Sequence, residues 1–138
     1  MIHIVEYRAD HFAGIDRLWR IVFPDDPPRN RAELTIPAKL ALEDELLLVA
    51  EAEAAKVVGT IMAGWDGHRG WLYAVAVDPD AQRQGVGRAL VAAALDRLAA
   101  RGCGKVNLQI RAGNTAVVAF YERLGFAVEP RTSMGRTI

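Results

Sequence analysis

The sequence predicts an α/β protein with a mixed sheet that has helices on both faces. Three observations lead to this prediction. Three strand-length apolar runs follow one another between residues 46 and 77, a glycine-containing loop then opens a long helix, and a strand–helix–strand pattern follows it. The expected order is therefore β-α-α-β-β-β-α-β-α-β. The three consecutive antiparallel strands exclude a doubly wound sheet.

Length and composition indicate one globular domain. The chain has 138 residues, of which 51% are hydrophobic and 25% charged, and we expect residues 1–138 to form a single domain. The 17 basic and 17 acidic residues balance, so the charge favours neither nucleic acid nor a membrane surface as a partner. No apolar run approaches the ~18 residues of a membrane span, and the first residues lack the apolar core of a signal peptide. We therefore expect a cytoplasmic protein.

The first third of the chain reads as a strand followed by two helices. Residues 2–8 alternate in polarity and predict the strand. Asp10 is expected to cap the first helix, which ends before Pro24 and carries apolar residues at helical spacing: Phe12, Ile15, Trp19 and Val22. Asn30, with an acidic residue three positions later, predicts the start of the second helix, and Pro37 predicts an interruption in it. Three strands are then expected at residues 46–52, 56–66 and 71–77.

A strand, a tight loop and a helix N-terminus follow in that order within residues 71–101. The first-turn amides of a helix have no partners within it and carry partial positive charge. Gly85 and Gly87 let an anion approach the backbone, and Arg83 and Arg88 add positive charge. We interpret the loop as a phosphate cradle, the alternative being an ordinary strand-to-helix turn. The apolar face expected for the helix consists of Leu90, Val91, Ala94, Leu95 and Leu98.

Spacing excludes two common phosphate-binding loops. A nucleotide P-loop needs Lys-Ser/Thr after its last glycine, where this chain has Arg88-Ala89. A dinucleotide fingerprint needs a small residue at Leu90 and an acidic residue after the next strand, which ends in Arg111. A nucleotide-binding enzyme is therefore disfavoured.

The last third predicts a strand, a helix and a final strand. Residues 105–111 alternate, and Asn114 is placed to cap a helix that stops at Leu124-Gly125. Residues 126–132 are expected to form the final strand, with 134–138 extending the edge. On the helix, Tyr121 shares the inward stripe with three apolar residues, Val117, Phe120 and Leu124. A buried phenol needs a partner, either a core carbonyl or a reacting group that takes its proton.

Two motifs in this half resemble those of the GNAT acyltransferase superfamily. The first is Gln82-x-x-Gly85-x-Gly87 after Val-Asp-Pro, and the second runs from Asn114 to Tyr121-Glu-x-Leu-Gly-Phe. The resemblance covers residues 71–126, whereas the first seventy residues match only in the order of elements. It implies the GNAT acyl-CoA N-acyltransferase fold and acetyl-CoA as cosubstrate.

The resemblance also implies roles for individual residues. The backbone of Val75, Ala76 and Val77 would bind the pantetheine arm, on a strand separated from the next one, and Asn114 would contact the same arm. Tyr121 would be the general acid that protonates the leaving thiolate, besides touching the cofactor. The diphosphate would lie on the amides of Gln84, Gly85, Val86, Gly87 and Arg88, with Gln82 and Arg83 alongside.

The expected activity is transfer of the acetyl group to a primary amine by direct attack, without a covalent enzyme intermediate. The predicted helices of the first third, residues 24–28 and the turn at 66–70 are expected to line the acceptor site. The acceptor is a small molecule or a protein N-terminus, and the general base is open: His68 and Glu33 are candidates, each more simply an exposed residue. No metal site is expected, and an edge strand would allow a homodimer.

Two alternatives remain. One is a non-catalytic module that binds acyl-CoA. The other is a RimI-like N-terminal alanine acetyltransferase of a ribosomal protein, but Gln109 stands where that enzyme has a glutamate base, and glutamine does not titrate. Small bacterial acetyltransferases of the YpeA type are similar at residues 64–70 and also lack an acid at this position.

Overall fold

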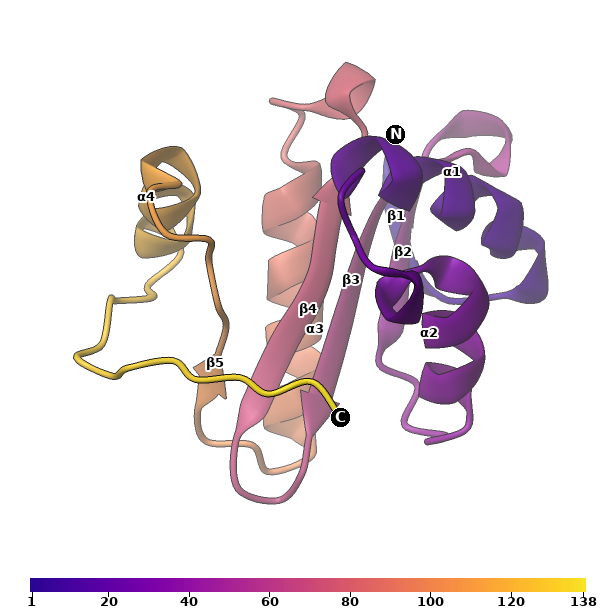
Figure 1. Ribbon diagram of the computed structural model, residues 1–138. Coiled ribbons are helices and arrows are strands. Elements are labelled where there is room, and N and C mark those ends of the chain that lie inside the picture. The colour runs from indigo at the N-terminus through magenta and orange to yellow at the C-terminus, as the bar shows by residue number, and fades with distance from the viewer. The chain divides into compact units, whose positions relative to one another are not determined.

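A five-stranded sheet in the order β1-β2-β3-β4-β5 forms the centre of the larger of two units (Figure 1). The computed structural model describes residues 1–138 and divides them into Met1–Leu108 and Gln109–Ile138. Four strands are antiparallel neighbours and the fifth is parallel to β4, so the mixed sheet that the sequence predicts is confirmed. The strands are β1 (His3–Glu6), β2 (Leu47–Glu51), β3 (Val57–Trp65), β4 (Gly70–Val77) and β5 (Val106–Asn107).

Helices cover both faces of this sheet. The pair α1 (Phe12–Val22) and α2 (Ala32–Leu40) lies on one face, and α3 (Val86–Ala100) crosses the other (Figure 1). Side chains of β2 alternate between the two layers, so Leu47 and Val49 join the core under α1 and α2, while Leu48 is equally buried on the opposite face. No helix has both the length and the apolar content to cross a membrane.

Helix α3 packs closely on β3 because Gly59 has no side chain. A Cβ at Gly59 would lie 2.9 Å from Leu90 Cδ1 and 2.9 Å from Val86 Cγ1. The buried residues of α3 otherwise follow the predicted face, except that Leu95 is half-exposed and Val86 joins it. The glycine therefore fixes how near the N-terminal turn of α3 comes to the sheet.

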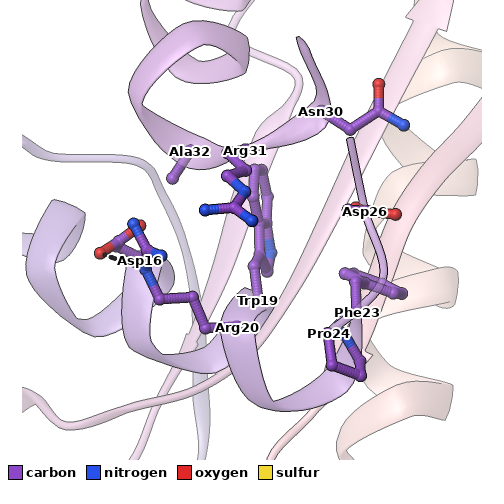
Figure 2. Close-up of a pocket in the computed structure, with 9 residues that line it drawn as sticks. All are labelled: Asp16, Trp19, Arg20, Phe23, Pro24, Asp26, Asn30, Arg31 and Ala32. Atoms are coloured by element: carbon purple, nitrogen blue, oxygen red, sulfur yellow. Dashed lines mark hydrogen bonds and ion pairs between the residues drawn. The ribbon is translucent and has the colours of Figure 1, made fainter. Parts of the chain in front are cut away.

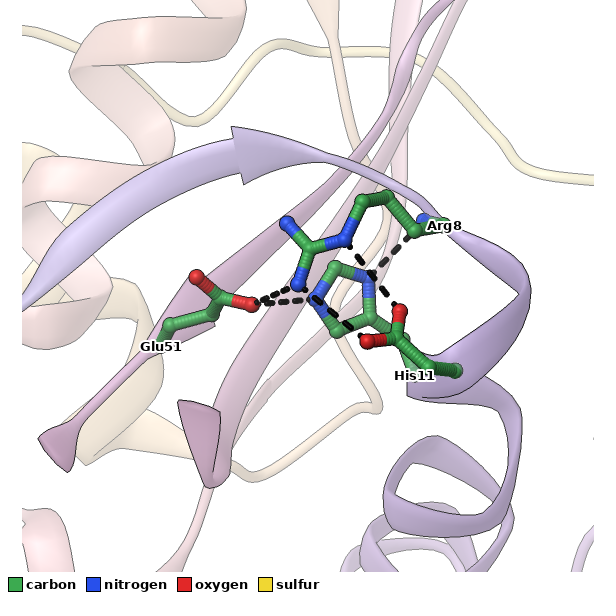
Figure 3. A network of polar contacts seen from close by, with 4 residues as sticks. Arg8, His11 and Glu51 are labelled. Atoms are coloured by element: carbon green, nitrogen blue, oxygen red, sulfur yellow. Dashed lines mark hydrogen bonds and ion pairs between the residues drawn. The ribbon is translucent and has the colours of Figure 1, made fainter. Parts of the chain in front are cut away.

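The predicted cap at Asp10 is wrong. Asp10 lies inside a 3₁₀ turn, Ala9–His11, and its carboxylate pairs with Arg8 at 3.2 Å. The buried ring of His11 makes the connection instead: its Nδ1 accepts from the Arg8 amide at 2.8 Å, and its Nε2 lies 2.6 Å from a Glu51 carboxylate oxygen (Figure 3). Arg8 donates to the same oxygen, and both contacts lower the pKa of Glu51. This partner lies 40 residues away, so local capping rules do not reveal it.

The start and the predicted interruption of the second helix also differ. Asn30 belongs to a 3₁₀ turn, Pro28–Asn30, and α2 begins at Ala32 after an Arg31 whose side chain makes no capping bond. Pro37 does not divide α2, which continues to Leu40. Because Pro37 is exposed, water can satisfy the carbonyl that its missing N–H leaves free.

The unit Gln109–Ile138 contains one helix, α4 (Thr115–Arg123). Asn114 caps it as predicted, accepting from the Val117 amide at 3.4 Å, and Gly125 follows its end with φ of 94°. The strand predicted at residues 126–132, and its extension at 134–138, are absent. Val128 is 75% exposed and Pro130 has no backbone N–H, so this segment has neither a buried face nor a full set of donors.

Asp78 ends β4 and connects it to α1. Its buried carboxylate accepts from the Asp80 amide at 2.9 Å and pairs with Arg17 at 3.2 Å. The Asp80 amide, followed by Arg17, holds the pKa of Asp78 below its usual value although burial opposes this. The ionised carboxylate therefore stabilises the fold.

Replacing Asp78 with asparagine removes that charge while leaving an acceptor. We expect Asp78→Asn to lower the free energy of unfolding at pH 7 by about 1 kcal/mol. Folding lowers the pKa of Asp78, so the difference in unfolding free energy between wild type and variant is complete above the unfolded pKa of about 3.9. The difference disappears as the pH falls through the pKa of the folded state. Urea unfolding between pH 2 and 7 measures it, with the exposed Asp80→Asn as control. A difference that does not depend on pH would contradict this role of the carboxylate.

Candidate active site

Strand β4 has a bulge in its middle. The register with β3 shifts between Thr60 and Met62, so β4 has one residue more than β3 across this interval. Within it, Ala74 takes φ of 48°, in the left-handed region that alanine rarely adopts. Bulges bend and twist a strand and are common next to functional sites.

Two buried side chains hold the bulge. The Thr60 hydroxyl donates to the Ala74 carbonyl at 2.8 Å and accepts from the Trp19 indole N–H at 2.9 Å. Thr60 is completely buried and Trp19 is 4% exposed, so water does not compete for these bonds. The chain of bonds therefore fixes the bulged backbone of β4 to helix α1.

The far edge of β4 is largely unpaired. β5 pairs with β4 only at Gly70 and Trp71, and no strand pairs with residues 72–77 along that edge. The strand predicted over residues 105–111 is thus reduced to Val106–Asn107. The free backbone groups can pair with an extended ligand in the way a further strand would.

The loop after β4 passes twice through left-handed backbone. Arg83 has φ of 66° and Gly85, the residue before α3, has φ of 78°. No atom would lie within 4 Å of a Cβ at Gly85, so its backbone conformation rather than crowding explains the glycine. Alternating backbone conformations of this kind turn successive amides toward one anion.

The amides of residues 84–88 are free donors. None of them donates a backbone hydrogen bond, and no side chain caps α3. The aligned peptides of this 15-residue helix add partial positive charge at the same end. Arg83 and Arg88 are exposed and take part in no ion pair. The loop thus has the donors and charge that bind a phosphate group.

In the smaller unit, Tyr121 is buried between two aromatic rings. It is 7% exposed, with ring centroids 4.9 Å from Phe120 and 5.5 Å from Phe126. Within its own unit the hydroxyl has no hydrogen-bond partner. Burial raises the pKa of Tyr121 to about 12. The phenol therefore remains protonated throughout the neutral and alkaline range in which amines react.

The other residues considered in the sequence analysis lie in a turn, in a side-chain hydrogen bond or on the surface. Asp66 accepts from the amides of His68 and Arg69 at 2.8 and 2.9 Å, which confirms the turn expected at residues 66–70, and His68 is exposed on that turn. Gln109 donates to the Ser133 hydroxyl, and Glu33 is exposed. None of these four residues lines the pocket beside α1 that is described next.

A pocket of about 160 Å³ lies between α1 and the connection to α2 (Figure 2). The buried Trp19, whose N–H binds Thr60, forms one wall, with Phe23 and Pro24 as further apolar lining. Asp26 and Arg31 supply polar groups. The pocket is thus in contact with the residue that anchors the bulge of β4.

The family model described as "Acetyltransferase (GNAT) family" matches residues 12–126. An acetyltransferase of Sodalis glossinidius is 40% identical over 126 residues, which cover 89% of this chain and 85% of that protein. An acetyltransferase of Pectobacterium atrosepticum is 35% identical over 135 residues, covering 96% and 92%. The chain therefore belongs to the GNAT acetyltransferase family, a family of acyltransferases.

Solved structures agree in fold. The aminoglycoside acetyltransferase AAC(6')-Iy, in complex with a bisubstrate analogue, has a TM-score of 0.80 at 19% identity, over 100% of this chain and 99% of that one. The ribosomal-protein-S18-alanine N-acetyltransferase of Escherichia coli has a TM-score of 0.74 at 26% identity, over 91% and 77%. The predicted GNAT fold is confirmed.

The hydroxyl of Thr60 gives a test of the bulge. Thr60→Val keeps the shape but leaves the Trp19 N–H and the Ala74 carbonyl without partners, so we expect unfolding to become easier by about 1–3 kcal/mol. Amide exchange at residues 74 and 75 should accelerate by more than the global change accounts for. Thr60→Ser keeps the hydroxyl and should retain slow local exchange. If serine and valine accelerate it equally, the hydrogen bond does not hold the bulge.

Proposed function

We propose that this protein transfers the acetyl group of acetyl-CoA to a primary amine by direct attack. The observation that supports the proposal most is the set of free amides at residues 84–88, in the loop and first helical turn that follow a strand with an unpaired edge. The amides are donors for the diphosphate, and Gln82, Arg83 and Arg88 lie beside them in the sequence. The unpaired edge at Val75–Val77 offers backbone groups to the pantetheine arm.

In the reaction, the amine nitrogen attacks the thioester carbonyl carbon. A C–N bond forms, the C–S bond breaks, and the sulfur leaves with the electron pair and takes up a proton. The attacking amine is protonated at pH 7, so it loses a proton to water before attack and another as the amide forms. Tyr121, with its free and protonated hydroxyl, is the proposed acid acting on the leaving sulfur, and Asn114 is the proposed contact to the pantetheine arm besides capping α4.

An N-terminal alanine acetyltransferase of the RimI type is the less favoured candidate. Its support is the fold similarity to the E. coli enzyme for ribosomal protein S18. Against it stands Gln109, whose amide has no titratable proton where a base is needed. A peptide beginning with alanine, included in an amine panel with acetyl-CoA, separates the two candidates.

The loop is tested by Gly85→Val. Valine is strained at φ of 78°, so the substitution should rearrange the amides and weaken acetyl-CoA binding about tenfold or more. Titration calorimetry measures the dissociation constant. Gly104→Val, at a position with open space and no left-handed φ, is the control and should bind normally. Equal affinity in both variants would remove the loop from the site.

The phenol is tested by Tyr121→Phe. This variant keeps the ring packing against Phe120 and Phe126 but removes the hydroxyl. With an amine that supports turnover, kcat should fall about 10²-fold or more while the dissociation constant of acetyl-CoA changes little. Steady-state kinetics and calorimetry give the two values. An unchanged kcat would exclude Tyr121 from the reaction. If the wild type binds acetyl-CoA but acetylates no amine of the panel, a non-catalytic module is favoured.

A further inference from the structure

The pocket between α1 and the α1–α2 connection contains two charged side chains that the protein leaves without partners. Asp16 and Arg20, which also line it, neutralise each other at 3.1 Å. Asp26 and Arg31 make no ion pair and no side-chain hydrogen bond, although both are only partly exposed (Figure 2). The walls therefore present one free negative and one free positive charge.

The remaining lining is apolar and the space is small. Trp19, Phe23 and Pro24 provide surface for a hydrocarbon group. The volume of about 160 Å³ is below the roughly 300–1,000 Å³ of sites for drug-sized ligands. A multi-ring acceptor would not enter, whereas a molecule of one amino acid would.

We infer that this pocket binds a free amino acid with an apolar side chain, whose α-amine is the acetyl acceptor. The planar guanidinium of Arg31 matches a carboxylate, which it can bind through two parallel hydrogen bonds. The Asp26 carboxylate attracts the ammonium group before its deprotonation. A peptide N-terminus has an amide where the free amino acid has its carboxylate, so it leaves Arg31 unpaired. The inference rests on the proposed acetyl transfer.

The location of the pocket supports this assignment. Trp19 forms its wall and, through Thr60, is bonded to Ala74 in the bulge of β4, the strand proposed to bind the pantetheine arm. An acceptor that contacts this indole therefore lies against the residue that anchors the cosubstrate strand.

Three probes separate the contributions. L-leucine carries both charged groups, L-leucinamide lacks the carboxylate, and 4-methylpentanoate lacks the amine. We expect L-leucine to bind at least tenfold more tightly than either of the others. Titrations followed by NMR report the affinity, and the indole N–H resonance of Trp19, assigned with Trp19→Phe, reports the location.

Matched variants test each wall. Arg31→Gln should abolish the preference for leucine over leucinamide, whereas Arg29→Gln, two residues away and outside the pocket, should keep it. Asp26→Asn should abolish the preference for leucine over 4-methylpentanoate, and the neighbouring Asp25→Asn should not. Thermal unfolding of each variant confirms that it is folded. Equal binding of the three probes, or equal effects of a lining and a control substitution, overturns the inference.

Product analysis distinguishes this inference from the proposed function. Formation of N-acetylleucine from acetyl-CoA, lost selectively in Arg31→Gln, supports both. If other amines are acetylated and leucine does not bind, the proposed acetyl transfer stands and the inference of an amino-acid acceptor is refuted. Binding of leucine at Trp19 without any acetylated product keeps the binding site and refutes its role as acceptor.

Discussion

The candidate site depends on the hydrogen bond between the Thr60 hydroxyl and the Ala74 carbonyl. A left-handed alanine costs on the order of 1–3 kcal/mol, and a regular strand would avoid it. The two bonds in the chain Trp19–Thr60–Ala74 contribute about 1 kcal/mol each, which is the same size as the strain. The bulge is therefore maintained by its buried surroundings, and without it β4 could pair regularly with β3 and direct its edge differently.

Charge distribution follows a related pattern. Where charged groups support the fold they have partners, as Arg17 has Asp78 and Arg8 has Glu51. An exposed arginine without a partner means little by itself, since water solvates it well. At Arg83, however, a free cation stands in a loop that also carries free amides and left-handed backbone. It is the coincidence of these features in one short segment, in a chain of zero net charge, that indicates an anion site.

The sequence predicted features that local rules determine. The start of α3 follows from a glycine before an apolar periodic run, and the start of α4 from Asn114. It could not predict contacts between distant residues, such as that between Trp19 and Thr60, which are 41 positions apart. An alanine at position 74 also does not indicate left-handed backbone. The strand predicted at residues 126–132 failed for the same reason, because a β-pattern forms a strand only where a partner strand is available.

The pKa of Tyr121 decides how the phenol can assist a departing thiolate. A thiol has an ordinary pKa of about 8.5, whereas burial raises the pKa of this phenol to about 12. Complete proton transfer from the phenol to a free thiolate would therefore be uphill. A hydrogen bond to the sulfur while negative charge develops on it has no such cost, and burial makes the bond stronger. Tyr121 is therefore proposed to act as the acid through a hydrogen bond that strengthens as the C–S bond breaks, so that it stabilises the leaving sulfur in the transition state.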